Sequence, residues 1–275
     1  MSEQKRTYPP GVTCWVDTEQ PDPAAAADFY GGLFGWSFEN AMPPDAPEVY
    51  LIATLGGRDV GAIGTASGSS ARWSTYVAVD DADTAAAAVT SAGGGILQAP
   101  QDAGPGGRMA VCADPQGAEF RLWQARRRLG SQIVNEPGSW NFSDLRTTRP
   151  RDAEQFYRAV FGWQYLDLGE GVRSMIAVPG YGDHLAATAD PGIHERQAGA
   201  PEGFADVIGA VQQAGADEPP HWHVTFSVDS RDESARRAVE LGGTVTGTAD
   251  TRWAALATVR DPQGATFSVS QFAGI

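Results

Sequence analysis

The sequence predicts an α+β protein of two tandem domains, because its motifs recur in the same order in both halves of the chain. The segment FYGGLFGW at residues 29–36 returns as FYRAVFGW at residues 156–163, an offset of 127 positions (156 minus 29). The segment DPQGA at residues 114–118 returns at residues 261–265, an offset of 147 positions. Motifs repeated in one order indicate a structural unit that occurs twice.

A third pair of positions supports the repeat and indicates an insertion. Trp73 corresponds to Trp222, and Asp80 corresponds to Asp229, both at an offset of 149 positions. The offset therefore grows by 22 between the first motif and the third (149 minus 127). We expect the second copy to carry an insertion of that size between Trp163 and Trp222.

The first half predicts two modules with the element order β-α-β-β-β. Asp22 can cap the first helix, Pro23 suits its first turn, and Gly35 ends it. Glycines at residues 56–57 predict a hairpin turn, and the DPQG segment at residues 114–117 predicts the turn before the last strand. The expected helices end at residues 34 and 91, and the expected strands span residues 12–17, 36–39, 49–54, 60–64, 73–79, 96–99, 108–113 and 119–123.

The second half predicts the same plan with an additional helix in the insertion. One helix is expected from Asp152 to Gly162, a second over residues 204–214, and a third over residues 233–241. The insertion is expected to follow the strand at residues 184–187. The expected strands span residues 141–145, 163–167, 174–178, 184–187, 222–228, a segment near residue 245, 256–259 and 266–270.

The length of 275 residues suits two domains. We expect a flexible N-terminal arm at residues 1–10 and a first domain at residues 11–125. A linker at residues 126–138 begins with three arginines and ends with Asn-Glu-Pro-Gly, and the second domain follows at residues 139–275.

Composition limits the classes of partner. The net charge of −14 argues against nucleic acid or an anionic membrane, because both require a basic protein surface. Cys14 and Cys112 are too few for a disulfide framework or a cysteine metal cluster, and they indicate buried thiols in a reducing compartment. The first ten residues are polar and contain no signal-like apolar segment, and no run approaches the length of a membrane span. A cytoplasmic location is therefore expected.

The paired modules resemble the vicinal oxygen chelate superfamily, which includes glyoxalase I, extradiol dioxygenases and bleomycin-resistance proteins. The resemblance depends on Phe-Tyr-x-x-x-Phe-Gly-Trp after the first helix of each half and on Asp-Pro-x-Gly before its last strand. With the Asn-Glu-Pro-Gly linker, the chain is similar to the two-domain glyoxalase-like proteins of actinobacteria that are often described as hydroxylases. The resemblance covers residues 11–272 and implies that the two modules of each domain curl into an open barrel around a site.

The resemblance also implies where a divalent metal would be bound. Members of the superfamily that chelate a metal use His or Gln on the first strand, His on the fifth strand and Glu on the last strand. These positions correspond to Trp15, Ser74 and Arg121 in the first copy and to Phe142, His223 and Ser268 in the second. Only one of the six is a metal-binding residue, and a cationic Arg121 would repel a metal ion. We expect no metal and no cofactor, with a site built from His184, His221 and His223 as the alternative.

Strand alternation predicts which side chains line the first site. Trp15 and Asp17 on the first strand, Tyr76 on the fifth, and Arg121 and Trp123 on the last would share one face. Aromatic rings with a few polar groups suit a flat, oxygenated aromatic ligand. The alternative is that Arg121 pairs with Asp17 or with Glu119 only to close the barrel.

The second site is predicted to differ in chemistry. His223 and Asp144 occupy inward positions, and a histidine beside a carboxylate can act as a general acid or base near neutral pH. The alternative is a histidine whose hydrogen bonds are structural. The further substrate-binding candidates of this half are Phe142, His184, His221, Thr225 and Trp253, the last because it lies near a loop and has no counterpart in the repeat.

Three functions are compatible with these residues. The first is a metal-independent protein that binds or acts on a bulky aromatic, polyketide-like metabolite in antibiotic biosynthesis or resistance. If it is an enzyme, acid–base chemistry such as isomerisation, dehydration or ring closure is expected. The alternatives are a non-catalytic binder that sequesters a drug and, third, a metal-dependent lyase or dioxygenase. Two similar domains in one chain imitate a dimer, so either a monomer or a homodimer is expected.

Overall fold

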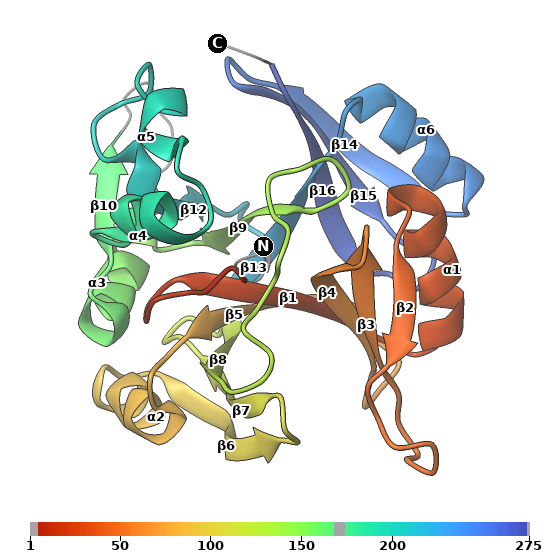
Figure 1. Ribbon diagram of the computed structural model, residues 1–275, viewed down its shortest axis with the longest axis horizontal. Helices are drawn as coiled ribbons and strands as arrows, with labels where there is room; N and C mark the ends of the chain where they lie inside the picture. The colour runs from red at the N-terminus through yellow and green to blue at the C-terminus, as the bar shows by residue number, and fades with distance from the viewer. Residues whose placement is uncertain (1–4, 168–173, 274–275) are drawn as a thin grey trace. The chain divides into compact units, whose positions relative to one another are not determined.

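The computed structural model describes residues 5–167 and 174–273, and each copy contains one eight-stranded mixed sheet with helices (Figure 1). The helices of the first copy are α1 (Pro23–Phe34) and α2 (Ala82–Ser91). Its strands are β1 (Thr13–Gln20), β2 (Ser37–Asn40), β3 (Tyr50–Leu55), β4 (Arg58–Thr65), β5 (Arg72–Ala78), β6 (Gly95–Ala103), β7 (Gly107–Ala113) and β8 (Glu119–Ala125). The predicted order β-α-β-β-β, twice over, is confirmed.

The second copy has the same strand plan with additional helices. Its helices are α3 (Pro150–Phe161), α4 (Tyr181–Thr188), α5 (Ile193–Arg196) and α6 (Arg231–Glu240), with a 3-10 turn η1 (Phe204–Asp206). Its strands are β9 (Trp140–Thr147), β10 (Gln164–Asp167), β11 (Ser174–Ala177), β12 (Val207–Gln213), β13 (His221–Ser227), β14 (Thr244–Asp250), β15 (Ala254–Arg260) and β16 (Thr266–Phe272).

Both sheets have the same topology. The strand orders are β2-β3-β4-β1-β5-β8-β7-β6 and β10-β11-β12-β9-β13-β16-β15-β14, and neither sheet closes on itself within the described segments. The first strand pairs in parallel with the fourth in each copy, with Asp17 opposite Ala62 and Asp144 opposite Ala210. The α+β fold predicted from the repeat is thus confirmed, with open sheets.

Local sequence explains where α1 begins and ends. The Asp22 carboxylate accepts hydrogen bonds from the backbone N–H groups of Ala24 and Ala25, and Gly35 ends the helix with a φ of 74°. The equivalent helix α3 has Arg149 at its cap position and no side-chain cap bond. It begins at Pro150, two residues before the predicted start.

Two predictions around the insertion are wrong. The strand predicted at residues 184–187 belongs to helix α4, and the helix predicted at residues 204–214 is η1 followed by strand β12. A short apolar run such as residues 207–211 has no period that separates a helix from a buried strand. This run forms a strand because pairing with β9 provides hydrogen-bond partners for the backbone groups of β12. Ile208 and Ala210 are buried in this arrangement. The insertion therefore comprises α4, α5 and η1 and precedes the fourth strand.

The chain forms two compact units, and each unit takes segments from both halves of the sequence. The first unit contains residues 1–14, 75–130 and 143–222, and the second contains residues 15–74, 131–142 and 223–275. The domains predicted at residues 11–125 and 139–275 correspond to the two repeated copies of the sequence. That division of the chain into domains stays a prediction.

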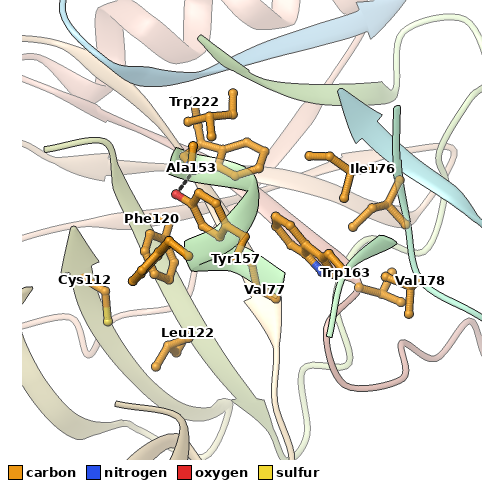
Figure 2. Packing of buried hydrophobic residues seen from close by; sticks show 14 of the residues in the cluster. Val77, Cys112, Phe120, Leu122, Ala153, Tyr157, Trp163, Ile176, Val178 and Trp222 are labelled. Atoms are coloured by element: carbon orange, nitrogen blue, oxygen red, sulfur yellow. Dashed lines mark hydrogen bonds between the residues drawn. The ribbon is translucent and has the colours of Figure 1, made fainter. Parts of the chain in front are cut away.

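The first unit is built around an aromatic core that Figure 2 shows at close range. Tyr157 stacks on Trp163 at 5.0 Å between ring centroids, and the Trp222 ring meets Tyr157 edge-on at 5.6 Å. The Trp222 indole N–H donates to the Tyr157 hydroxyl, the dashed contact in Figure 2, and that hydroxyl lies 3.4 Å from an Asp114 carboxylate oxygen. Tyr157 is completely buried.

The second unit repeats this cluster. Tyr30 stacks on Trp36, Trp73 donates to the Tyr30 hydroxyl over 3.1 Å, and Tyr30 donates to Asp261 over 2.7 Å. Gln20 donates to the same Asp261 oxygen over 2.7 Å. The helices α1 and α6 of this unit lie side by side (Figure 1), with Arg237 bonded to a backbone carbonyl of α1.

These two clusters give the physical reason for the echoed motifs. In each unit the tyrosine of the FY segment and the aspartate of the DPQGA segment are bonded to one another, with the repeated tryptophan as a third member. The tyrosine and aspartate of one cluster come from different halves of the chain. Each motif therefore occurs twice because two copies of one cluster must be built.

Candidate functional site

The first-copy candidates on β5 and β8 form a buried cation–aromatic cluster in the first unit. The Arg121 guanidinium donates to the Tyr76 hydroxyl over 2.7 Å, and its central carbon lies 5.3 Å from the centre of the Tyr76 ring. The Trp123 ring meets Tyr76 edge-on at 6.1 Å, and its indole N–H donates to the backbone carbonyl of Arg128. Tyr76 and Arg121 are buried and Trp123 is half-buried. The structure thus brings these three predicted residues together.

The first-copy candidates on β1 form a second polar cluster, in the second unit. Trp15 donates its indole N–H to the Tyr50 hydroxyl, and Tyr50 donates to the Asp17 carboxylate, both over 3.0 Å. Asp17 is 1% exposed. Tyr50 comes from β3 and was not among the predicted site residues.

The repeat gives Asp17 a counterpart in Asp144, which also accepts a hydrogen bond from a neighbouring strand. Gln212 on β12 donates to the Asp144 carboxylate over 2.6 Å. Gln212 occupies the position of Gly64 in the first copy, where the Tyr50 ring covers the glycine. Both copies therefore keep a buried carboxylate on the first strand, and a donor to it comes from Tyr50 in one copy and from Gln212 in the other.

His223 is deeply buried and bonded within the second unit. One of its ring nitrogens, Nε2, lies 2.8 Å from the Ser268 hydroxyl, and Ser268 lies 3.2 Å from the Thr258 hydroxyl. Thr225 is also buried, and it lies opposite Ser268 in the pairing of β13 with β16. Asp144 belongs to the first unit, and Phe142 is a half-buried residue of the second.

His221 lies near an ion pair at the start of β13. Arg146 on β9 donates to a Glu218 carboxylate oxygen over 3.2 Å, and His221 Nε2 lies 3.8 Å from the same oxygen. Burial opposes the ionisation of Glu218, but the Gly215 backbone N–H and the Arg146 guanidinium together hold the pKa of Glu218 below its ordinary value. The other ring nitrogen of His221 contacts the Pro219 carbonyl.

The remaining two candidates lie elsewhere in the fold. His184 is on α4, where its Nε2 lies 3.1 Å from the Thr7 hydroxyl and 3.2 Å from the Thr7 carbonyl. It therefore has no counterpart on a strand of the first copy. Trp253 follows β14, is 38% exposed, and carries the Arg252 guanidinium over its ring at 4.9 Å.

The side chains at the implied metal positions do not fit a divalent metal. In the first copy the last-strand position holds Arg121, a cation that is engaged with Tyr76. In the second copy the last-strand Glu is replaced by Ser268, which bonds to the one histidine. No group of three or more His, Cys, Asp or Glu side chains within residues 5–167 and 174–273 is arranged to hold a metal ion, so the three-histidine alternative is not found there.

Sequence reasoning missed Tyr50, Gln212 and Arg146. Tyr50 and Gln212 reach the strand carboxylates from neighbouring strands, and only the register of β3 and β12 reveals this. Arg146 carried a usable signal, because it follows Asp144 by two positions and must share its face of β9. The misassignment of β12 as a helix removed its partner strand from consideration.

The fold and the repeated modules define a protein with the vicinal oxygen chelate architecture. The family model of the Glyoxalase-like domain matches residues 14–123 and again residues 142–270. The chain therefore belongs to the Glyoxalase-like domain family and contains two copies of that domain, as the resemblance implied.

Two curated relatives are similar over nearly the whole chain. One is "Putative glyoxylase CFP32" of Mycobacterium tuberculosis (strain CDC 1551 / Oshkosh), which is 36% identical over 97% of both chains. Another is the anthracycline biosynthesis protein DnrV of Streptomyces peucetius, which is 36% identical and covers 95% of this chain and 94% of its own.

Solved structures share the fold at low sequence identity. The Mn(II)-bound glyoxalase from Novosphingobium aromaticivorans has a TM-score of 0.62 and 16% identity, over 95% of this chain and 82% of its own. The 2,3-dioxygenase LapB from Pseudomonas sp. KL28 has a TM-score of 0.60 and 14% identity, over 97% and 94%. In this chain no described helix is both long enough and apolar enough to cross a membrane.

Proposed function

We propose that this protein binds or converts a bulky, flat aromatic metabolite in antibiotic biosynthesis or resistance, without a protein-held metal. The observation that carries the proposal is the buried cluster of Arg121 with Tyr76 and Trp123. It places a cation and aromatic rings where the superfamily implies a carboxylate ligand for a metal. We infer that these groups take the place of a metal site and suit an electron-rich ring system.

The chemistry of this cluster favours an oxygenated aromatic ligand. Aromatic side chains contact a flat ring at low entropic cost, and a guanidinium can donate to phenol or carbonyl oxygens on its edge. The similarity to anthracycline biosynthesis proteins over nearly the whole chain supports the same class of ligand. A polyketide-like polycyclic metabolite combines these features.

Proton transfer is the chemistry that the second copy can supply. His223, in the second unit, is the group that would exchange a proton with the ligand, and Asp144 stays a separate acid–base candidate in the first unit. Isomerisation, dehydration and ring closure need only such acid–base steps. The other predicted contacts, Phe142, Thr225, His221, His184 and Trp253, stay candidates for ligand binding.

A sequestering binder is the second candidate function. It is favoured by the hydrogen-bond chain from His223 through Ser268 to Thr258, because a histidine held in such a chain can be purely structural. In that case the protein would retain the ligand and release it unchanged. Because two similar copies in one chain imitate a dimer, we propose either a monomer or a homodimer as the working form.

The experiment is an incubation with a panel of polyhydroxylated anthraquinones, followed by tryptophan fluorescence and mass spectrometry of the recovered ligand. Saturable quenching with a changed ligand mass or retention time supports the enzyme, and the His223→Ala variant should then lose turnover while it still binds. Quenching with an unchanged ligand supports the binder. No saturable quenching by any member of the panel would reject the proposed ligand class.

A further inference from the structure

The two copies differ in charge at the positions of an ion pair between the first and fifth strands of the first copy. In the first copy Glu19 on β1 forms an ion pair with Arg72 on β5, with 2.9 Å between the charged atoms. The equivalent residues of the second copy are Arg146 on β9 and His221 on β13. The acidic Glu19 is thus replaced by the basic Arg146, and the residue at the position of Arg72 is His221 and not an acid.

The acidic partner of Arg146 comes instead from a loop that the first copy lacks in this form. The loop at residues 66–71 has the sequence ASGSSA and carries no charge. Its equivalent at residues 214–220 has the sequence AGADEPP, is one residue longer, and supplies Glu218 to Arg146 over 3.2 Å. The ion pair is therefore between a strand residue and a short loop.

The Arg146 guanidinium retains a donor that could bind a further anionic group. Leu145 packs in the core of the first unit, so Arg146 lies on the opposite face of β9 together with Asp144. Its side chain is 26% exposed and its Nη1 donates to Glu218, while its buried Nε has no hydrogen-bond partner. A guanidinium has five N–H donors, and it binds a planar carboxylate through two of them.

We propose that Arg146 recognises a carboxylate on the aromatic ligand, with Glu218 as the internal anion that holds the guanidinium in place until the ligand arrives. This inference rests on the proposed function, because it names a property of the same ligand. Glu218 and the ligand carboxylate compete for one guanidinium. The Asp144 carboxylate on the same face of β9 accepts a hydrogen bond from the Gln212 side-chain amide over 2.6 Å.

The test compares anthraquinone-2-carboxylate with anthraquinone-2-carboxamide, which has the same shape and no charge. Wild-type protein is expected to bind the carboxylate about tenfold more tightly at low ionic strength. Arg146→Gln should remove that preference and leave binding of the carboxamide unchanged. Arg146→Lys should retain part of the preference, because it keeps the charge but loses the planar pair of donors.

Glu218→Gln separates recognition from a merely structural ion pair. If Glu218 competes with the ligand, its removal should increase the preference for the carboxylate, whereas a purely structural pair would weaken binding of both compounds together. The matched control is Arg72→Gln, which removes one positive charge from the equivalent ion pair of the first copy. It should leave the preference unchanged.

The outcomes distinguish this inference from the proposed function. Equal binding of the two compounds by the wild type, or a preference that persists in Arg146→Gln, overturns the role of Arg146 and leaves the aromatic ligand standing. If neither compound binds, the proposed ligand class and the inference fail together. Thermal unfolding of each variant shows whether a loss of binding reflects a loss of fold.

Discussion

At the residue scale, the aspartate of each DPQGA turn is a buried carboxylate that accepts hydrogen bonds from backbone N–H groups of its own turn. Asp114 is 3% exposed, and burial raises the pKa of its carboxyl despite hydrogen bonds from the backbone N–H groups of Ala118 and Gln116. A raised pKa means that the folded protein binds this proton more tightly than the unfolded chain does. The stability that Asp114 contributes is therefore largest at low pH. It is lost as the pH rises from the ordinary pKa of an aspartate through the raised pKa of Asp114 in the folded protein.

Asp114→Asn should remove this pH dependence. The unfolding free energy of the variant minus that of the wild type is expected to become more positive as the pH is raised from acidic to neutral. The reason is that only the wild type must bury a charge at neutral pH. Urea denaturation at both pH values measures it. A difference that becomes more negative with rising pH would show that the carboxylate is stabilised by its hydrogen bonds more than it is penalised by burial.

The candidate site shows what residue types can and cannot reveal. That Tyr76 and Arg121 share one face followed from strand alternation, whereas the hydrogen bond between them was not predicted. Tyr50 was not accessible, since its hydroxyl reaches Asp17 only through the register of β3 with β4 and of β4 with β1. The alternation of residues along a strand does not predict a contact that a long side chain makes across an intervening strand.

At the scale of elements, the helix cap at Asp22 gives a direct test of local stability. Its carboxylate satisfies two backbone N–H groups at the start of α1. Asp22→Ala should lower the unfolding free energy by about 1 kcal/mol. Arg149→Ala is the matched control at the equivalent position of α3, where no side-chain cap bond exists. Equal losses in the two variants would argue against the cap as the cause.

Strand β12 was the element that sequence reasoning misassigned, and Gly209 tests its position. A Cβ atom at Gly209 would lie 2.3 Å from the backbone carbonyl oxygen of Ser143 on the paired strand β9. Gly209→Ala should therefore cost about 1–3 kcal/mol, because two backbones must separate. Gly247→Ala on β14 is the control, since nothing lies within 4 Å of its Cβ position. A neutral Gly209→Ala would mean that β12 does not pair with β9 in this register.

Elements with capping residues, turns and repeats were predictable, and the insertion was not. The helices α1, α2 and α6 have an Asp or Ser cap in the sequence, and their ends lie within two residues of the expectation. The insertion has no second copy for comparison, and its apolar runs are too short to show a period. Tertiary pairing, which sequence does not display, decided which run became a strand.

At the scale of the whole molecule, each compact unit requires both halves of the chain. The Tyr30 cluster needs Asp261, and the Tyr157 cluster needs Asp114. A fragment of residues 1–130 should therefore be unfolded or should dimerise so that Tyr30 meets Asp114 of a second copy. Mixing it with residues 131–275 should restore the near-ultraviolet circular dichroism of the intact chain. A monomeric fragment that unfolds cooperatively by itself would contradict this account.

The central claim is that a flat aromatic metabolite binds without a metal, and one titration tests it most directly. The protein is dialysed against EDTA, its metal content is measured by mass spectrometry, and tryptophan quenching by anthraquinone-2-carboxamide is followed before and after addition of Mn(II). The account predicts saturable quenching by the metal-free protein that Mn(II) leaves unchanged. Quenching that appears only with Mn(II), or no saturable quenching in either state, would contradict it.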